Sequence, residues 1–361
     1  MRMTILFTLV SMILPLPVRA ATPASSMLEL TFQGQRIEGL PLTWDHTTAI
    51  LLGRDGQLWD IPLREASDFR KTLSHFQPYS LSELRATLLR ELGGGYEVTS
   101  TSHYLIAHPQ GRRDVWAQRF EELYRSLVRY FFIRGLTVKE PPFPLIGIVY
   151  RSQQDFVRGT AASGTPVGGG VVGCYQLRSN RILLYEPSDG PNSAFEWQQG
   201  AATAVHEATH QTAFNTGLHS RYAPPPTWLA EGLATMFEAR GVYDSSTYRN
   251  RRDRINDARF AQFRQGVAPQ HRPELLTAIV SSDRLFSTSP DAAYAEAWAL
   301  TFYLVETQSR QYADYLARTA QRPAFQPYNA SERLADFTAV FGSDWRMLEA
   351  RLLRFMEELG G

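Results

Sequence analysis

Hydrophobic and polar residues alternate over short stretches near the start of the chain. Four such stretches lie between residues 27 and 66: 28–32, 36–42, 49–52 and 58–61. A period of two is typical of strands with one buried face, and glycine-containing turns such as those at Gly34 and Gly56 join antiparallel neighbours. We therefore expect residues 27–66 to form a small antiparallel β module.

Apolar residues recur at helical spacing further along, over residues 80–92 and 115–133. Residues 96–107 alternate like a strand, and the short apolar runs at 145–150 and 181–185 are typical of buried strands. Beyond about residue 193 the spacing is mainly helical, and the last helix has one apolar face, made of Trp345, Leu348, Leu352, Phe355 and Leu359. We expect that face to close the core.

These patterns predict an α+β fold. After the β module, residues 95–361 are expected to form one domain, with an α/β half at 95–190 and a helical half at 191–361. The chain has 361 residues, of which 43% are hydrophobic and 20% charged, and this composition is typical of a globular protein. The net charge of +1 gives no electrostatic reason to expect a nucleic-acid partner. Because Cys174 is the single cysteine, the chain has no intramolecular disulfide.

The first twenty residues differ from the rest of the chain. Residues 4–18 are largely apolar, and residues 18–20 (Val-Arg-Ala) resemble a small-residue cleavage site. The apolar stretch is shorter than the roughly 20 residues that a transmembrane helix needs, and two prolines interrupt it. We expect residues 1–20 to be a signal peptide, and the mature protein to be periplasmic or secreted, with no stable membrane span.

The segment His206-Glu207-Ala208-Thr209-His210 has the spacing HExxH. On a helix, two histidines four residues apart lie on one face and can bind one metal ion. The flanking residues favour a helix, because Ser193 and Glu196 form a capping-box pattern and Gly217 is a suitable stop. Neutral imidazoles suit Zn²⁺, and a catalytic zinc site needs three protein ligands and one position for water.

A third ligand is therefore expected, and Glu231 lies 21 residues beyond His210, in a second predicted helix. Three prolines precede that helix, and Thr227 is its expected N-cap. A turn between the two helices lets the carboxylate approach both imidazoles, so the residues predict one zinc ion bound by His206, His210 and Glu231. Two other interpretations stay open: the histidines as hydrogen-bonded core residues, and Glu231 as a capping or surface carboxylate.

The chain resembles the gluzincin zinc metallopeptidases, and within them the uncharacterised, peptidase MA-like bacterial branch. The resemblance rests on the HExxH segment and on Pro226-Thr227-Trp228-Leu229-Ala230-Glu231-Gly232-Leu233-Ala234, and it extends from about Tyr96 to the C-terminus. It implies a thermolysin-like zincin domain that hydrolyses peptide bonds. In that mechanism Glu207 is the general base, which takes a proton from water and passes it to the leaving amine.

Two departures from the family limit what can be transferred. The G-x-M-E-N motif of aminopeptidase N-type enzymes is missing, so nothing is expected to anchor a free amino terminus, and endopeptidase action is favoured. The aspartate that thermolysin-type enzymes have four residues after the glutamate ligand is Thr235 here. A partner that orients a metal-bound histidine must come from elsewhere or be absent.

Tyr294 lies 63 residues after Glu231, similar to the catalytic tyrosine of aminopeptidase N-type gluzincins, and is the expected donor to a tetrahedral oxyanion. Residues 289–291 (Ser-Pro-Asp) predict a helix start just before it. Its position on an apolar helical stripe also allows a purely structural role. His219 and Tyr222 are weaker alternatives, for which loop packing is the expected role.

The strand at 181–185 precedes the motif helix, and we expect it to be an edge strand with which an extended peptide substrate can pair. The glycine-rich residues 160–173 are expected to form a loop near the cleft. The expected function is an exported zinc endopeptidase acting on peptides or proteins. The alternatives are a catalytically silent zincin-fold binding or scaffold protein and a hydrolase of a non-peptide amide in the cell envelope. Retention of all four residues around the metal favours an enzyme.

Overall fold

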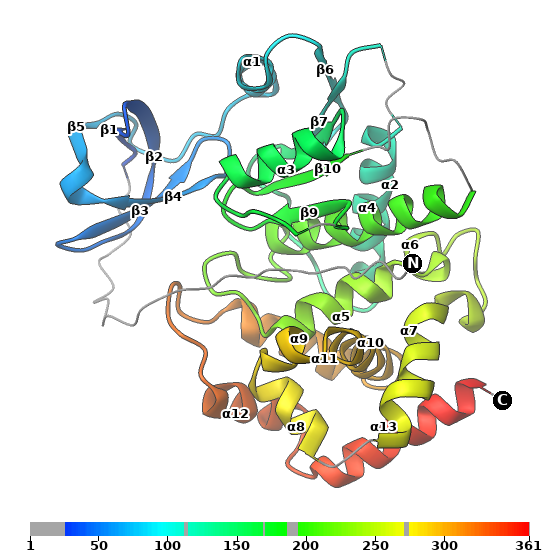
Figure 1. The fold of residues 1–361 in the computed structure, drawn as a ribbon. Coiled ribbons are helices and arrows are strands. Elements are labelled where there is room, and N and C mark those ends of the chain that lie inside the picture. Colours follow the sequence, from blue (N-terminus) through cyan, green and yellow to red (C-terminus); the bar gives the residue numbers. More distant parts are fainter. Residues whose placement is uncertain (1–25, 112–114, 169, 186–193, 271–273, 361) are drawn as a thin grey trace.

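The computed structural model describes residues 26–111, 115–168, 170–185, 194–270 and 274–360, and in this part the chain begins with a five-stranded antiparallel sheet (Figure 1). Its order is β4-β3-β2-β1-β5, with β1 (Leu28–Phe32), β2 (Gln35–Trp44), β3 (Thr48–Gly53), β4 (Leu58–Pro62) and β5 (Ala66–Lys71). Leu30, Ile37 and Leu51 form its small core. The sequence predicted the first four strands but missed β5, because β5 is exposed beyond its first residue and has no apolar alternation. The expected signal peptide lies outside the described residues.

A second, mixed sheet has the order β6-β7-β8-β10-β9. Its strands are β6 (Tyr96–Ser100), β7 (Tyr104–Pro109), β8 (Leu145–Tyr150), β9 (Gly173–Gln176) and β10 (Arg181–Tyr185). The single strand expected at 96–107 is in fact a hairpin of β6 and β7. The expectation of an edge strand at 181–185 is wrong, because β10 pairs with β8 on one side and with β9 on the other. The edge strand next to β10 is β9, which has only four residues and so gives too short a pattern to recognise.

Side chains of the mixed sheet alternate between two cores. On β8, Ile146 and Ile148 point to the core that contains residues of α1 (Leu81–Leu92) and α3 (Gln153–Ala162). Leu145 and Val149 point to the opposite core, which contains residues of α2 (Ala117–Phe132) and α4 (Ala194–Asn215). The nearly continuous apolar run of β8 follows from this burial on both faces. α4, which contains the HExxH segment, therefore packs directly on the sheet.

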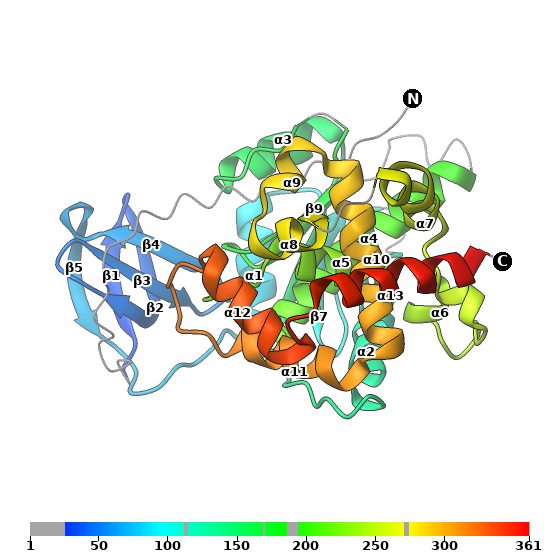
Figure 2. The same ribbon diagram turned by 90° about the horizontal axis from the view of Figure 1, so that it is seen from below.

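Helices make up the rest of the chain. They are α5 (Thr227–Phe237), α6 (Arg240–Tyr243), α7 (Asp257–Gln262), α8 (Glu274–Ser281), α9 (Arg284–Thr288), α10 (Pro290–Thr307), α11 (Ser309–Ala320), α12 (Ala330–Phe341) and α13 (Trp345–Gly360). Short helical turns are η1 (Leu63–Glu65), η2 (Arg251–Arg254), η3 (Phe263–Val267) and η4 (Ala268–Gln270). α10 lies at the centre, where α5, α7, α11 and α13 contact it (Figure 2). The structure is thus α+β, with a β module, a mixed sheet and a helical part, and in the described residues no helix is both long and apolar enough to cross a membrane.

The β module is held against the loop between α4 and α5. The buried guanidinium of Arg221, in that loop, donates to the backbone oxygens of Gly56, Leu177 and Arg178. Gly56 belongs to the β3–β4 turn of the module, whereas Leu177 and Arg178 belong to the β9–β10 turn. One arginine therefore joins the module, the mixed sheet and the segment that leads into α5.

α5 and α10 approach each other closely at Gly232. A Cβ atom at this position would lie 2.5 Å from the carbonyl oxygen of Ala297 and would collide with the hydroxyl of Thr301. Ala297, with its single methyl group, also keeps the facing side of α10 small. Because Glu231 precedes Gly232, this contact sets how far the Glu231 carboxylate extends from α10.

We predict that Gly232→Ala lowers the free energy of unfolding by about 1–3 kcal/mol, because the added methyl group forces two packed helices apart. Urea denaturation checks this. The matched control is Gly266→Ala, where a Cβ meets nothing within 4 Å and stability is expected to stay the same or rise slightly. Equal stability of the Gly232→Ala variant and the native protein would contradict the close contact.

Candidate metal centre

α4 presents His206 and His210 on one face, one helical turn apart, as the HExxH spacing predicted. Their rings lie 4.7 Å apart, nearly perpendicular, and their Nε2 atoms are separated by 3.1 Å. Both side chains are almost fully buried. Small neighbours such as Ala204 and Ala208 let this helix pack into the core, so the two imidazoles are held by a rigid element.

α5 brings Glu231 to the two imidazoles, which the sequence could only propose. Glu231 Oε2 lies 3.2 Å from His206 Nε2, and Glu231 Oε1 lies 3.4 Å from His210 Nε2. One ligand atom from each of the three residues falls within 4.8 Å of the other two. The interpretation of Glu231 as a capping or surface carboxylate is therefore wrong, because the side chain is fully buried beside the histidines.

The donor set fits a zinc ion. Ligand atoms bound at about 2.0–2.1 Å in tetrahedral geometry lie about 3.4 Å from one another. Here the two Nε2 atoms are 3.1 Å apart, and each lies 3.2 or 3.4 Å from a different oxygen of the Glu231 carboxylate. Three buried oxygens around the cluster, Glu207 Oε1, Glu231 Oε1 and Tyr294 Oη, have no hydrogen-bond partner among the described residues. Buried polar atoms are normally satisfied, so these atoms indicate a place for a bound ion and its ligands.

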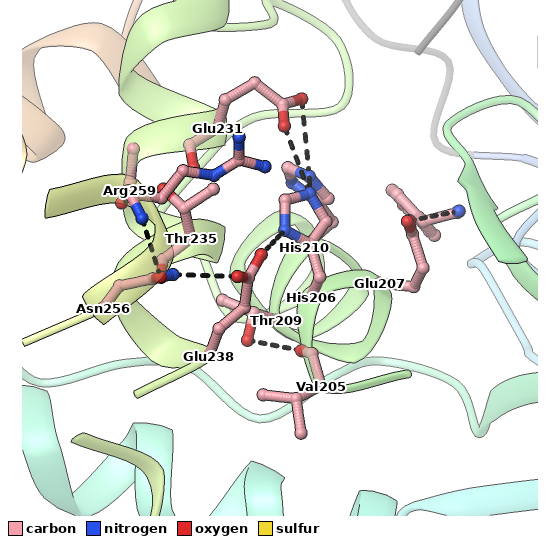
Figure 3. Close-up of polar contacts among 12 residues, drawn as sticks. Val205, His206, Glu207, Thr209, His210, Glu231, Thr235, Glu238, Asn256 and Arg259 are labelled. Carbon is pink, nitrogen blue, oxygen red and sulfur yellow. Dashed lines mark hydrogen bonds and ion pairs between the residues drawn. The ribbon is translucent and has the colours of Figure 1, made fainter. Parts of the chain in front are cut away.

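Glu238 orients His206. The Nδ1 atom of His206 lies 2.8 Å from Glu238 Oε1, and since an ionised carboxylate only accepts, Nδ1 carries the proton. The other ring nitrogen, Nε2, faces His210 and Glu231 (Figure 3). Asn256 in turn donates from Nδ2 to Glu238 Oε2 at 2.8 Å and to the Thr235 carbonyl at 2.9 Å. Glu238, one turn beyond Thr235, thus supplies the partner for His206 that the sequence left open.

The start of α5 is capped differently from the expectation. Thr227 is not the N-cap, because the helix begins at Thr227 and the preceding Pro226 has no side chain that can cap it. The backbone N–H of Thr227 instead donates to Asp283 Oδ1 at 2.9 Å. Arg333 holds Asp283 with two bonds of 2.9 and 2.8 Å, and together with Thr227 it keeps the pKa of that carboxyl low. The cap comes from a residue far along the chain, so local sequence could not identify it.

Glu207 points away from the ligands toward the edge of the mixed sheet. Its Oε2 accepts a 2.6 Å hydrogen bond from the backbone N–H of Tyr175 on β9 (Figure 3). Burial raises the pKa of Glu207 to about 8, although the charge of His206 opposes this. One oxygen of the carboxyl is therefore fixed by the sheet, and the other is free to act.

Tyr294 lies near Glu231 and Glu207, although α10 is buried all round at this point. Burial raises the pKa of Tyr294 well above its usual value, and the charges of these two glutamates raise it further. The expected helix start is present, with Pro290 at the first position of α10. The hydroxyl faces the carboxylate of the candidate ligand Glu231, with which it interacts.

His219 and Tyr222 both pack against aromatic rings, and the two ring nitrogens of His219 have no hydrogen-bond partner among the described residues. The ring of His219 lies 5.2 Å from that of Phe214, and burial lowers the pKa of His219 to about 3. The ring of Tyr222 lies 5.8 Å from that of Phe325. Neither side chain belongs to the group of possible metal ligands found in the described part of the chain.

The electrostatics of the cluster favour a positive charge. Burial alone would lower the pKa of His206, but hydrogen bonds with Glu231 and Glu238 raise that pKa to about 10. Burial would raise the pKa of Glu231, but His210 and His206 keep it well below the usual range. The pKa of His210 is lowered by burial. Two carboxylates thus favour a cation between them and the imidazoles, which is the charge that a divalent metal supplies.

The sequence interpretation missed Glu238, Asn256 and Asp283. Glu238 had a detectable signal, since residues seven apart on a helix lie on the same face and Glu238 follows Glu231 by seven. Asn256 is the N-cap of α7, where its Oδ1 accepts from the backbone N–H of Arg259. Its contact with Glu238 depends on how α7 packs, which no local pattern encodes.

Comparison with known proteins gives limited similarity. A family model described as "Protein of unknown function (DUF1570)" matches residues 200–326, which include both ligand helices. No curated protein matches the chain. The crystal structure of an M1 zinc metallopeptidase mutant from Deinococcus radiodurans matches with 13% identity and a TM-score of 0.42, over 92% of this chain and 62% of that one. A mutant of that peptidase bound to a Tyr-ser-ala substrate matches with 14% identity and a TM-score of 0.42, over 92% and 61%. The chain spans about six-tenths of the length of those peptidases.

We predict that Glu238→Ala weakens zinc binding about 10–100-fold, because His206 loses the acceptor that fixes its tautomer and orientation. Glu238→Gln, which keeps an acceptor but loses the charge, should fall between that variant and the native protein. Titration with Zn²⁺ against a competing chelator measures the affinity. Glu357→Ala, at an exposed position on α13, is the control. Native affinity in both Glu238 variants, with unchanged circular dichroism, would refute the orienting role.

Proposed function

We propose that this protein is a zinc-dependent hydrolase of peptide bonds with a thermolysin-like zincin domain. The supporting observation is the convergence of His206, His210 and Glu231 at separations that suit one tetrahedral ion, beside a buried glutamate with one free oxygen. A structural zinc site uses four protein ligands, whereas three ligands leave a position for water. A bound zinc ion polarises a carbonyl and acidifies water.

The protein's own groups divide the remaining work. Tyr175 fixes one oxygen of Glu207, so that the other accepts the proton of the attacking water and later gives it to the leaving amine. Tyr294 donates from its hydroxyl to the oxygen on which negative charge develops. Glu238 and Asn256 keep His206 in the tautomer that the ligand set requires.

Substrate binding is proposed along β9. This strand is the edge of the sheet, and the side of it that faces away from β10 carries the N–H that bonds Glu207. An extended peptide that pairs with this edge passes directly beside the general base. Endopeptidase action is favoured by the absent G-x-M-E-N motif, and export by residues 1–20. N-terminal sequencing of the mature protein tests the export, for which Ala21 is the expected first residue.

We predict that Glu207→Gln retains zinc but loses peptide cleavage by a factor of about 10²–10⁴, because the substituted amide cannot accept the proton of water. Zinc content and cleavage of a peptide library are measured on the native protein and the variant. Glu97→Gln, an exposed position on β6, is the control.

Other results of the same experiment distinguish between the alternative functions. Stoichiometric zinc with no cleavage by the native protein would favour a catalytically silent scaffold. Cleavage of cell-envelope amides in place of peptides would favour the non-peptide hydrolase. Absence of zinc from both proteins would overturn the metal centre.

We predict that Tyr294→Phe lowers kcat about 10²–10³-fold with little change in KM, because its hydroxyl acts on charge that forms only in the transition state. Steady-state kinetics on a peptide cleaved by the native protein measures this. Tyr222→Phe, in the loop between α4 and α5, is the matched control and should keep native kinetics. A purely structural Tyr294 would show itself as unchanged kcat.

A further inference from the structure

Arg259 points at the metal centre from α7. Its guanidinium carbon lies 5.0 Å from the centre of the Tyr294 ring, and its positive charge counteracts the rise in the pKa of that tyrosine. Figure 3 shows the side chain extending from α7 toward Glu231 and the histidines. Arg259 is half-buried, so its head group can still reach a bound molecule.

The guanidinium has few partners of its own. Nη1 donates to Gln262 Oε1 at 2.9 Å, and in the described part of the chain no carboxylate lies within ion-pair distance of Arg259. Some arginines of the helical part do have an ion-pair partner, such as Arg254 with Glu306 through two bonds of 3.1 and 2.8 Å. An arginine has five N–H donors, and among the described residues only Nη1 of Arg259 has a hydrogen-bond acceptor.

The position of Arg259 is fixed by the same residue that supports the metal centre. Asn256 accepts from the backbone N–H of Arg259 at 3.2 Å while it donates to Glu238. The backbone that carries the guanidinium is therefore tied to the partner of His206. A flat, forked cation held in this way matches a carboxylate, with which it can form two parallel hydrogen bonds.

We infer that Arg259 binds a carboxylate of the substrate and thereby selects acidic or carboxylate-ended peptides. The inference rests on the proposed function, because it places the scissile carbonyl beside Tyr294. Residues of an extended peptide are about 3.3 Å apart. With the guanidinium beside the Tyr294 ring, the carboxylate belongs to a residue within one or two positions of the cleaved bond.

This carboxylate has two possible sources. One is the C-terminal carboxylate of a short peptide, and the other is the side chain of an aspartate or glutamate inside a longer peptide. Both present the same planar anion to the guanidinium. A set of hexapeptides distinguishes the two sources. Each peptide has an acetylated N-terminus, carries either Glu or Gln at one position, and ends in either a carboxylate or an amide.

The test compares kcat/KM for these hexapeptides between the zinc-loaded native protein and the variants Arg259→Gln and Arg259→Lys. The native protein should prefer one carboxylate-bearing peptide over its neutral counterpart about 10–100-fold, as expected for a charge-assisted hydrogen bond. Arg259→Gln should abolish that preference, and Arg259→Lys should restore part of it. Arg264→Gln is the matched control, because Arg264 lies over the ring of Phe260 and is exposed.

Binding without turnover separates this inference from the proposed function. Calorimetry measures the affinity of the same peptides for zinc-loaded Glu207→Gln, with and without Arg259→Gln. One outcome is that no peptide is cleaved, but carboxylate-bearing peptides bind more tightly than neutral ones and Arg259→Gln removes that difference. This outcome supports the carboxylate site and contradicts the peptidase function. If peptides are cleaved and Arg259→Gln changes acidic and neutral ones equally, the peptidase stands and the carboxylate site is overturned. Absence of both cleavage and preference refutes both.

Discussion

The close approach of α5 and α10 at Gly232 is the contact on which the metal centre depends. This contact fixes the distance between α5 and the central helix α10, and so fixes the position from which Glu231 extends toward α4. Tyr294 belongs to α10 itself. α4 is fixed independently, because it packs on the mixed sheet. A three-residue ligand set requires that two helices, α4 on the sheet and α5 on α10, meet with a precision of a fraction of an ångström, and here both belong to one hydrophobic core. Small residues at the helix contact make that possible, since no flexible side chain lies between the two backbones.

Much of the chemistry was visible in the sequence because it is encoded locally. His206 and His210 are one helical turn apart, and the surrounding alanines favour the helix that this spacing needs. The strand β8 and the helices α1 and α13 were likewise predicted, since each has a long or strongly periodic apolar pattern. The pairing of Glu231 with the histidines needed an assumption about tertiary contact, and the structure supplies that contact.

What the sequence could not give depends on contacts between distant segments. β10 is an interior strand only because the four residues of β9 pair with its outer side, and so short a segment has no recognisable period. Asp283 caps α5 from 56 residues away, through a carboxylate that Arg333 holds in place. A distant carboxylate of this kind satisfies an N–H group at the helix start, as a local N-cap residue would. A helix without a capping residue in its local sequence therefore does not have to begin weakly.

The polar groups of the candidate metal centre are buried in a way that the folding of the chain alone does not favour. Glu207 and Glu231 are fully buried, and each has an oxygen with no hydrogen-bond partner among the described residues. Burying such groups costs stability unless a ligand completes them. A cation bound only by the folded chain stabilises it by an amount that grows with the logarithm of the ratio of the cation's concentration to its dissociation constant. The fold therefore keeps a locally unfavourable arrangement that a bound metal ion would stabilise, and the contacts of Glu238, Asn256 and Gly232 hold that arrangement in place without the ion.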